Sequence, residues 1–244
     1  MIKIGGLQKV SAIDYPEKLA CTIFLSKCNF RCGCCHNPTL LENEEEIIRE
    51  EGFLNRIDES GYLDGIVISG GEPTLQHGLE EFIKKIKKGR NNFFIKLDTN
   101  GSHFEVLQEL KKGKLVDYVA MDVKAPPYLY SSVIGRDIDL RDDVEKGMAL
   151  TCQFPDYEFR TTIIPIERDN GDFSFMKVGE VVDIAKWIVD ITGSNEHKYY
   201  LQPFVPKKDG LLDSRLEAFP ETPKALLEDM KKEVVKYLLN CRIR

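Results

Sequence analysis

The sequence has little that would place it in a membrane or on a nucleic acid. It contains no apolar run near the ~18 residues that a membrane-spanning helix needs. Its first residues, Met1–Gly6, lack the apolar core of a secretion signal. Lys and Arg number 34 against 40 Asp and Glu, which gives a net charge of −6 with no dominant basic block. We therefore expect no nucleic-acid partner, no membrane contact and a cytoplasmic location.

The seven cysteines lack the even number and the wide spacing of a disulfide framework. Four of them, Cys28, Cys32, Cys34 and Cys35, lie close together in one short segment. Such clustering is typical of metal binding in a reducing compartment. The cysteines therefore predict a metal site and no disulfides.

Short apolar runs alternate with amphipathic segments along the chain. The expected strands are 19–25, 66–68, 93–97, 116–121, 157–164 and 198–204. The expected helices are 43–57, 79–89, 103–111, 142–152, 178–191 and 223–240. Strands that alternate with helices predict parallel βαβ units, and this number is too small for a closed (β/α)8 barrel. The pattern predicts an α/β fold, an open partial (β/α)6 barrel in a single domain. Around the core at 19–205 we expect an N-terminal leader at 1–18 and a C-terminal helical extension at 206–244.

Cys28, Cys32 and Cys35 form the spacing C-x3-C-x2-C directly after the first expected strand. Three thiolates can hold three irons of a cubane cluster and leave the fourth iron open to a substrate. The alternative is a structural zinc site with His36 or Cys34 as the fourth ligand. Structural zinc sites usually combine two separated ligand pairs, and no second C-x2-C pair follows in this sequence.

Polar motifs follow the next three expected strands. They are Ser69–Pro73 (SGGEP), Asp98–Gly101 (DTNG) and Asp122–Lys124 (DVK). Ligands of parallel α/β folds bind at the carboxyl ends of the strands. The glycines allow close backbone approach to a ligand, and Glu72 is an acceptor for a cationic amino group. Taken singly, each motif also fits a helix cap or a loop ion pair.

Together with the cysteine spacing, these motifs resemble those of the radical S-adenosylmethionine (radical SAM) superfamily. The resemblance implies a partial (β/α)6 barrel and a [4Fe-4S] cluster on Cys28, Cys32 and Cys35. It implies that one electron from the cluster cleaves SAM into methionine and a hydrogen-abstracting 5′-deoxyadenosyl radical. The residues implied to contact SAM are Cys34, His36, Gly70, Gly71, Glu72, Asp98, Asn100, Asp122, Lys124 and Gln202.

Within that set, the resemblance implies catalytic roles for Asp122 and Lys124. Lys124 is expected to neutralise the SAM carboxylate or to stabilise departing methionine, and Asp98 and Asp122 to bind its amino or ribose groups. Cys34 stands where the family usually has an aromatic residue near the adenine, so stacking by that side chain is not expected to be strong.

Three further segments resemble the anaerobic ribonucleoside-triphosphate reductase activating proteins, which are related to pyruvate formate-lyase activating enzyme. They are Gly6–Lys18, Arg160–Pro165 and Leu201–Phe204. The resemblance implies that a glycyl radical is generated on a partner enzyme, with flavodoxin or ferredoxin as electron donor. We expect the leader and the segment 201–204 to frame the partner's entrance. The alternatives are a radical SAM enzyme acting on a small molecule or on a different glycyl-radical enzyme, and a non-catalytic zinc-binding adaptor.

Overall fold

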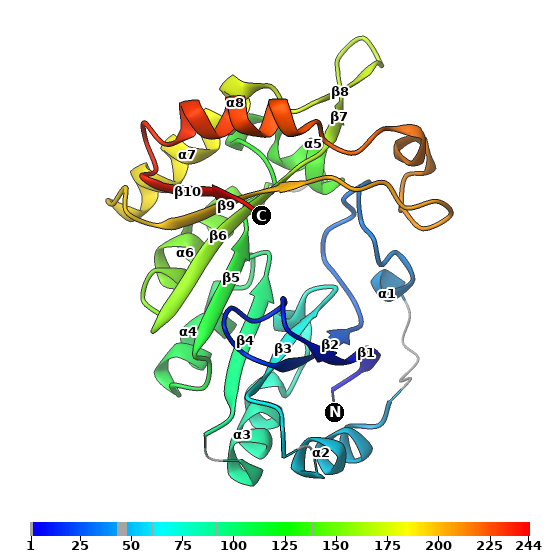
Figure 1. Cartoon of the computed structure of the whole chain (residues 1–244), viewed down its shortest axis with the longest axis vertical. Coiled ribbons are helices and arrows are strands. Elements are labelled where there is room, and N and C mark those ends of the chain that lie inside the picture. Colours follow the sequence, from blue (N-terminus) through cyan, green and yellow to red (C-terminus); the bar gives the residue numbers. More distant parts are fainter. Residues whose placement is uncertain (1, 43–47, 60, 91, 138) are drawn as a thin grey trace.

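The computed structural model describes residues 2–42, 48–59, 61–90, 92–137 and 139–244. Its main sheet has eight strands in the order β1-β2-β3-β4-β5-β6-β9-β10 (Figure 1). These strands are β1 (Ile4–Ser11), β2 (Ala20–Leu25), β3 (Gly65–Gly70), β4 (Phe94–Thr99), β5 (Tyr118–Asp122), β6 (Asp156–Ile163), β9 (Lys198–Pro203) and β10 (Asn240–Ile243). A separate antiparallel hairpin consists of β7 (Pro165–Glu167) and β8 (Phe173–Phe175).

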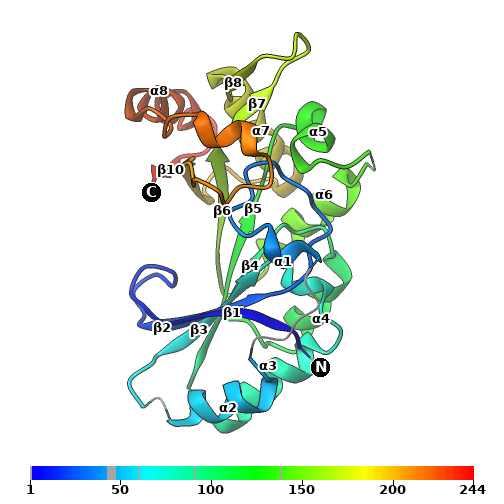
Figure 2. The same cartoon turned by 90° about the vertical axis from the view of Figure 1, so that its right-hand side faces the viewer.

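Helices connect the strands of the main sheet. They are α1 (Thr39–Glu42), α2 (Glu50–Glu59), α3 (Leu79–Gly89), α4 (Phe104–Lys112), α5 (Tyr130–Ile134), α6 (Arg141–Thr151), α7 (Val178–Thr192) and α8 (Lys224–Val234). The strands β2 to β6 and β9 are paired in parallel. Figure 2 shows α4 and α6 on the same side of β4 and β5. Parallel strands joined by crossover helices confirm the predicted α/β partial (β/α)6 barrel in a single domain.

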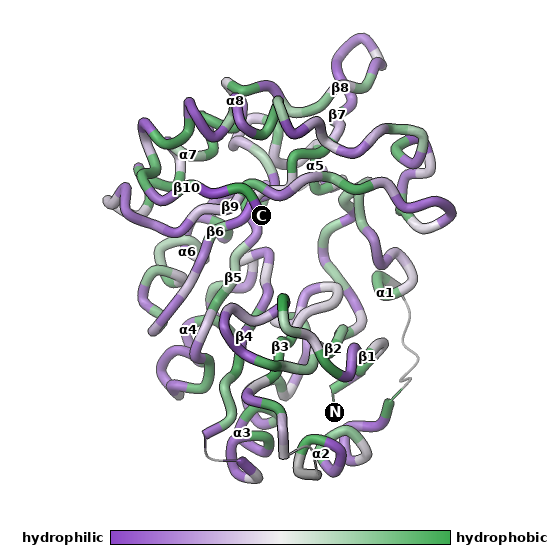
Figure 3. Tube along the Cα trace, viewed as in Figure 1, coloured by the Kyte–Doolittle hydropathy of each residue, from purple (hydrophilic) through white to green (hydrophobic). Residues whose placement is uncertain are grey.

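The alternation of side chains along each strand separates a core from a polar face. In β4, Ile95 and Leu97 are fully buried in a core shared with α3 and α4. Lys96 and Asp98 lie between them in sequence and therefore point to the opposite, concave face, where Arg160 of β6 meets Asp98. Figure 3 shows hydrophobic residues concentrated along β2 and β3, consistent with strands that are buried in the middle of the fold.

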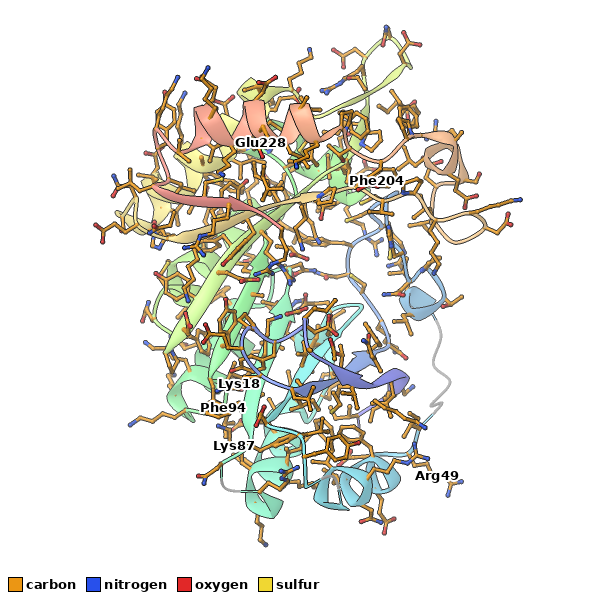
Figure 4. The ribbon with its side chains drawn as sticks, in the orientation of Figure 1. Lys18, Arg49, Lys87, Phe94, Phe204 and Glu228 are labelled. Atoms are coloured by element: carbon orange, nitrogen blue, oxygen red, sulfur yellow. The ribbon has the colours of Figure 1, made fainter. Side chains whose placement is uncertain are left out.

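The loop between β1 and β2 packs at the amino ends of β4 and β5. Tyr15 is 4% exposed, and its ring centroid lies 5.7 Å from that of Tyr118 and 6.4 Å from that of Phe94. The Nζ of Lys18 lies 4.0 Å from the Phe94 ring centroid, and Figure 4 shows the two side by side. The later part of the leader, residues 11–18, thus lies at the amino ends of the strands, whereas Ile4 at the start of β1 pairs with Leu25 at the carboxyl end of β2. That the leader frames the partner's entrance stays a prediction.

The C-terminal segment differs from the expected helix. That helix was expected to reach Asn240, but α8 ends at Val234, and β10 then pairs in parallel with β9. Cys241 of β10 is 4% exposed and joins the core. The strand also gives the otherwise open edge of β9 a hydrogen-bonding partner, which a longer helix would not. The expected helical extension therefore ends in a strand.

Other segments also depart from the expected pattern, including α5 and the hairpin of β7 and β8. The leader forms β1, which pairs antiparallel with β2. The helix expected over 43–57 begins at Glu50, and residues 43–47 lie outside the described residues. Ile48 instead forms an isolated bridge with Ile4. Within the described part of the chain, we find no helix of the length and apolarity that a membrane span requires.

Candidate active site

One cavity of about 340 Å³ opens at the carboxyl ends of the parallel strands. The loops after β2, β3, β4, β5 and β9 all contribute to its wall. Every residue selected from the sequence lines this cavity: Cys28, Cys32, Cys34, Cys35, His36, Gly70, Gly71, Glu72, Asp98, Asn100, Asp122, Lys124 and Gln202. Parallel strands bring the residues that follow them to one edge of the sheet, so distant motifs become neighbours. The chemical role of each residue stays a prediction.

The cysteine loop (residues 26–38) joins β2 to α1 and is held in place by contacts outside itself. Arg31 N donates a hydrogen bond to Ile134 O at 2.7 Å. Phe30 is 2% exposed, and its ring packs edge-on against Tyr130 with centroids 6.3 Å apart. These contacts hold the loop against α5. The cysteines that line the cavity therefore belong to a backbone that is fixed by contacts with another element.

The thiols of the cysteine loop are free in this structure. Burial raises the pKa of Cys28 and Cys32 to about 12 and that of Cys34 to about 11, while the charge of Lys124 acts in the opposite direction. Cys28, Cys32 and Cys34 therefore favour the protonated form at neutral pH, and a metal that binds a thiol must displace its proton.

Gly70 and Gly71 are required because the chain approaches itself closely. A Cβ on Gly71 would lie 2.0 Å from the carbonyl oxygen of Lys27. Gly70 has φ +122°, and a Cβ there would lie 2.2 Å from Leu25 N. Glu72 N donates to Lys27 O at 2.8 Å. The two glycines thus allow the turn after β3 to pack against the end of β2 and the start of the cysteine loop. This packing requirement for glycine was not predicted from the sequence.

The Glu72 carboxylate is 0% exposed and ties the turn after β3 to the turn after β4. Its Oε1 accepts hydrogen bonds from Thr74 N (3.1 Å), Thr74 Oγ1 (2.5 Å) and Thr99 Oγ1 (2.8 Å). Its Oε2 accepts from Asn100 N at 2.7 Å. A carboxylate oxygen can accept a second hydrogen bond, and that Oε2 also receives one from a ligand stays a prediction.

The Asn100 side chain connects the turn after β4 to the cysteine loop. Its Nδ2 donates to Asn29 Oδ1 at 3.0 Å, and its Oδ1 accepts from Ser102 N at 3.0 Å and Ser102 Oγ at 2.7 Å. Asn29 Nδ2 completes the triangle by donating to Ser102 Oγ at 2.8 Å. Asn100 therefore positions the cysteine loop as well as lining the cavity.

A chain of alternating charges crosses the cavity floor with Arg160 at its centre. The Nε of Arg160 lies 2.8 Å from Asp122 Oδ1, and its Nη1 lies 3.4 Å from Asp98 Oδ2. Lys124 Nζ lies 2.8 Å from Asp122 Oδ2, and Lys96, only 1% exposed, pairs with Asp98. Arg160 and Asp122 are direct partners in the register of β5 and β6, which explains their meeting.

This network keeps its members ionised. Burial by itself would raise the pKa of Asp98 and Asp122, but the charges of Arg160 and the adjacent lysines hold both below their usual range. Burial would likewise lower the pKa of Lys124, but Asp122 holds it above its usual value. Asp122 therefore favours the charged form of Lys124. Its side chain keeps 30% exposure, so it can meet a ligand carboxylate in the cavity.

Sequence reasoning missed three residues of this site. Arg160 was noted only as part of a resembling segment, and Lys96 and Asn29 received no role. The signal for Lys96 was present, because charges at alternate positions of an otherwise apolar strand, as in Lys96 and Asp98, mark a polar face of a sheet. The Asn29 contact joins loops 71 residues apart in the chain, and no local pattern predicts it.

The donor set at the cavity suits an iron–sulfur cluster. Among the described residues, no three His, Cys, Asp or Glu side chains converge as ligands of a single ion. A cubane cluster takes one thiolate per iron, so its thiolates stand around it instead of converging on one point. Cys28, Cys32 and Cys35 line one cavity from a single braced loop, with the cation of Lys124 opposite. We conclude that these residues fit the cluster.

Comparison with known proteins identifies the family. A model described as the radical SAM superfamily matches residues 22–151. A candidate glycyl-radical enzyme activating enzyme of Methanocaldococcus jannaschii is 36% identical over 249 residues, which cover 99% of this chain and 95% of that one. This chain is a radical SAM protein of the glycyl-radical enzyme activating family. The family assignment favours the cluster over the structural zinc that the sequence left open.

Other relatives are more distant. The pyruvate formate-lyase-activating enzyme of Staphylococcus aureus is 29% identical over 139 residues, which cover 50% of this chain and 52% of that one. The crystal structure of Streptococcus suis SuiB bound to S-adenosylmethionine superposes with a TM-score of 0.61 at 12% identity, over 91% of this chain. The chain spans about half the length of that structure, 51%. This likeness supports the fold alone.

Family membership confirms that this radical SAM protein is an enzyme. The superfamily uses a [4Fe-4S] cluster and SAM, so both cofactor predictions are also confirmed. The identity of the partner enzyme belongs to the proposal below.

We expect Glu72→Ala to weaken both folding and SAM binding. Losing a hydrogen bond to a charged acceptor costs roughly 1.5–3 kcal/mol, equivalent to about ten- to a hundredfold in SAM affinity. Iron content should persist, because α5 also holds the cysteine loop. Equilibrium dialysis with SAM and urea unfolding measure the two effects.

Thr74→Val is the matched control for this prediction. It removes one donor to Oε1 of Glu72 and leaves Oε2 unchanged, so stability should fall while SAM affinity stays within about threefold. Unchanged SAM affinity in Glu72→Ala would contradict the ligand-binding role of this carboxylate.

Proposed function

We propose that this enzyme cleaves SAM reductively and installs a glycyl radical on an anaerobic ribonucleoside-triphosphate reductase. The observation that carries the reaction class is that the three motif cysteines, the glycine turn after β3 and the Lys124–Asp122 pair line one cavity. Cys28, Cys32 and Cys35 would hold the cluster. The bound cluster supplies the single electron that SAM cleavage requires.

The protein's own residues would bind and orient SAM. Lys124, kept protonated by Asp122, would pair with the SAM carboxylate or stabilise departing methionine. The Glu72 Oε2 atom and Asp98 would accept hydrogen bonds from its cationic amino group or its ribose. His36 and Gln202 lie on the cavity wall, where they would contact the ligand near the opening.

The reductase is proposed as the partner because of the segments Gly6–Lys18, Arg160–Pro165 and Leu201–Phe204, which resemble those of reductase activating proteins. Gln202, Pro203 and Phe204 line the cavity, so the segment that ends β9 is near the reacting centre. The sheet is not closed into a barrel, since β1 and β10 are its two edges. A glycine-bearing loop would enter through this open side and exclude water as the partner docks.

The electron would come from flavodoxin or ferredoxin. The enzyme would act in the cytoplasm, with no nucleic-acid or membrane partner.

The test combines the reconstituted enzyme, SAM, dithionite and the reductase of the same organism. We expect an electron-paramagnetic-resonance doublet from the glycyl radical, and label from the glycine α-carbon in 5′-deoxyadenosine. A reductase whose radical-site glycine is replaced by alanine is the control and should remain radical-free. If every glycyl-radical protein of the organism stays radical-free while a small metabolite is turned over, the small-molecule alternative is correct.

A further inference from the structure

A segment that follows the cavity covers the outer side of the cysteine loop. This covering segment (residues 206–216) donates backbone hydrogen bonds from Leu212 N to Cys35 O at 3.3 Å and from Asp213 N to Gly33 O at 2.9 Å. The contact is close, because a Cβ on Gly33 would lie 3.1 Å from Asp213 Cβ. The cavity wall includes Val205 but no residue of the covering segment. The segment therefore covers the cysteine loop without lining the cavity.

Cationic side chains donate to the backbone carbonyls of the cysteine loop from several elements. Lys207 Nζ of the covering segment lies 3.0 Å from His36 O. Arg136, after α5, places its Nε 2.7 Å from Asn29 O. Arg31 Nη1 within the loop donates to Cys28 O at 2.7 Å. Positive charge thus surrounds the backbone that carries the cluster ligands, although the chain as a whole has a net charge of −6.

Several nearby acidic side chains are committed to partners of their own. Asp213 pairs with Arg215 at 2.8 Å, and Asp139 pairs with Arg141. The Glu217 carboxylate accepts backbone hydrogen bonds from residues 209–211. Asp137 and Asp209 are exposed.

The covering segment also offers apolar area and an accessible charge. Leu212 of the covering segment is 39% exposed. Lys207 and Lys208 are both exposed. An exposed apolar centre with a charged rim is the usual composition of a transient protein interface.

We propose that the covering segment and the cations around the cysteine loop form the docking surface for a small acidic electron-carrier protein. This proposal rests on the proposed function, which needs one electron for each SAM cleaved. The reduced carrier loses one electron and the cluster gains it, and no bond forms or breaks. SAM and the partner's glycine loop occupy the cavity side, so the carrier approaches the cysteine loop from its covered outer side. Opposite charge speeds such encounters and orients the partners.

The test measures the second-order rate constant for reduction of the reconstituted cluster by photoreduced flavodoxin and, separately, by a reduced ferredoxin. Lys208→Glu should lower the rate constant about tenfold at low ionic strength, and the loss should shrink as salt is added. Lys208 is chosen because Lys207 itself bonds to the cysteine loop. Lys88→Glu, on exposed α3 surface, changes the net charge equally and should leave the rate within about twofold.

Three results separate this proposal from its alternatives. Equal slowing by Lys208→Glu and Lys88→Glu overturns it, because the effect is then one of overall charge. Unchanged reduction by both carriers in Lys208→Glu also overturns it. If Lys208→Glu instead impairs radical installation driven by dithionite, with no carrier present, the surface contacts the glycyl-radical enzyme. If the wild-type enzyme with dithionite fails to install a radical, only the proposed function is contradicted. The docking proposal is unaffected, because the rate of cluster reduction by a carrier is measured without the glycyl-radical enzyme.

Discussion

Replacing Cys28, Cys32 or Cys35 by alanine should abolish reductive SAM cleavage. Each thiolate holds one iron, and a cluster that already leaves one iron without a protein ligand has no spare thiolate to lose. The wild-type protein should bind about four irons and four sulfides after anaerobic reconstitution, and each variant should bind fewer. Iron and sulfide analysis, with 5′-deoxyadenosine measured by chromatography, checks the prediction.

The remaining cysteines provide matched controls. Cys21 and Cys241 are buried in the helix-side cores, and Cys152 contacts His197 at the other end of β6. Their alanine variants should retain cleavage. Cys34→Ala should retain the cluster as well, although Cys34 lines the cavity. If Cys34→Ala loses the cluster while Cys35→Ala keeps it, the ligand assignment is wrong.

Arg160→Met should be among the most destabilising substitutions in this protein and should also abolish productive SAM binding. It leaves Asp98 and Asp122 on the cavity floor without the cation that lies between them. Removing one partner of a buried ion pair costs about 3–5 kcal/mol when the other charge is left uncompensated. Lys96 and Lys124 still pair with the two acids, so the loss should fall below that range. Urea unfolding measures the loss of free energy. Lys198→Met is the control: its pair with Asp156 is about half exposed, so its removal should cost less than ~1 kcal/mol.

The pH dependence provides a second measurement for Arg160→Met. In the wild type, the pKa of Asp98 and Asp122 lies below the unfolded value, so these acids add stability above about pH 4 and lose it as pH falls through their folded pKa. Without Arg160, only Lys96 and Lys124 oppose the effect of burial, so the pKa of both acids rises relative to the wild type. The deficit of the variant should therefore be largest at neutral pH and shrink at acidic pH, between the higher folded pKa values of the variant and the lower ones of the wild type. A deficit that is constant with pH would mean that packing, not charge, is what Arg160 supplies.

Much of the fold follows from local patterns. The apolar runs and the helical spacing after them specify the order of the parallel strands, because each crossover helix returns the chain in the same direction. The C-terminal β10 and the antiparallel β1 were not predictable in this way. Both depend on the free edge of an already formed sheet, and neither Cys241 nor Leu7 carries a local signal for which edge it joins.

The sequence by itself determined which residue types line the site, through the cysteine spacing and the polar motifs after successive strands, and these indicated the family. Only the tertiary structure decided how those residues are held. Glycine, carboxylate and amide were all expected to bind ligand, but Gly71 is needed for contact with Lys27, and Asn100 bonds to Asn29. The structure also placed Arg160 between two acids. A motif consists of residues a few positions apart, so it can be recognised in the sequence. Packing and charge balance depend instead on which distant strands become neighbours in the sheet.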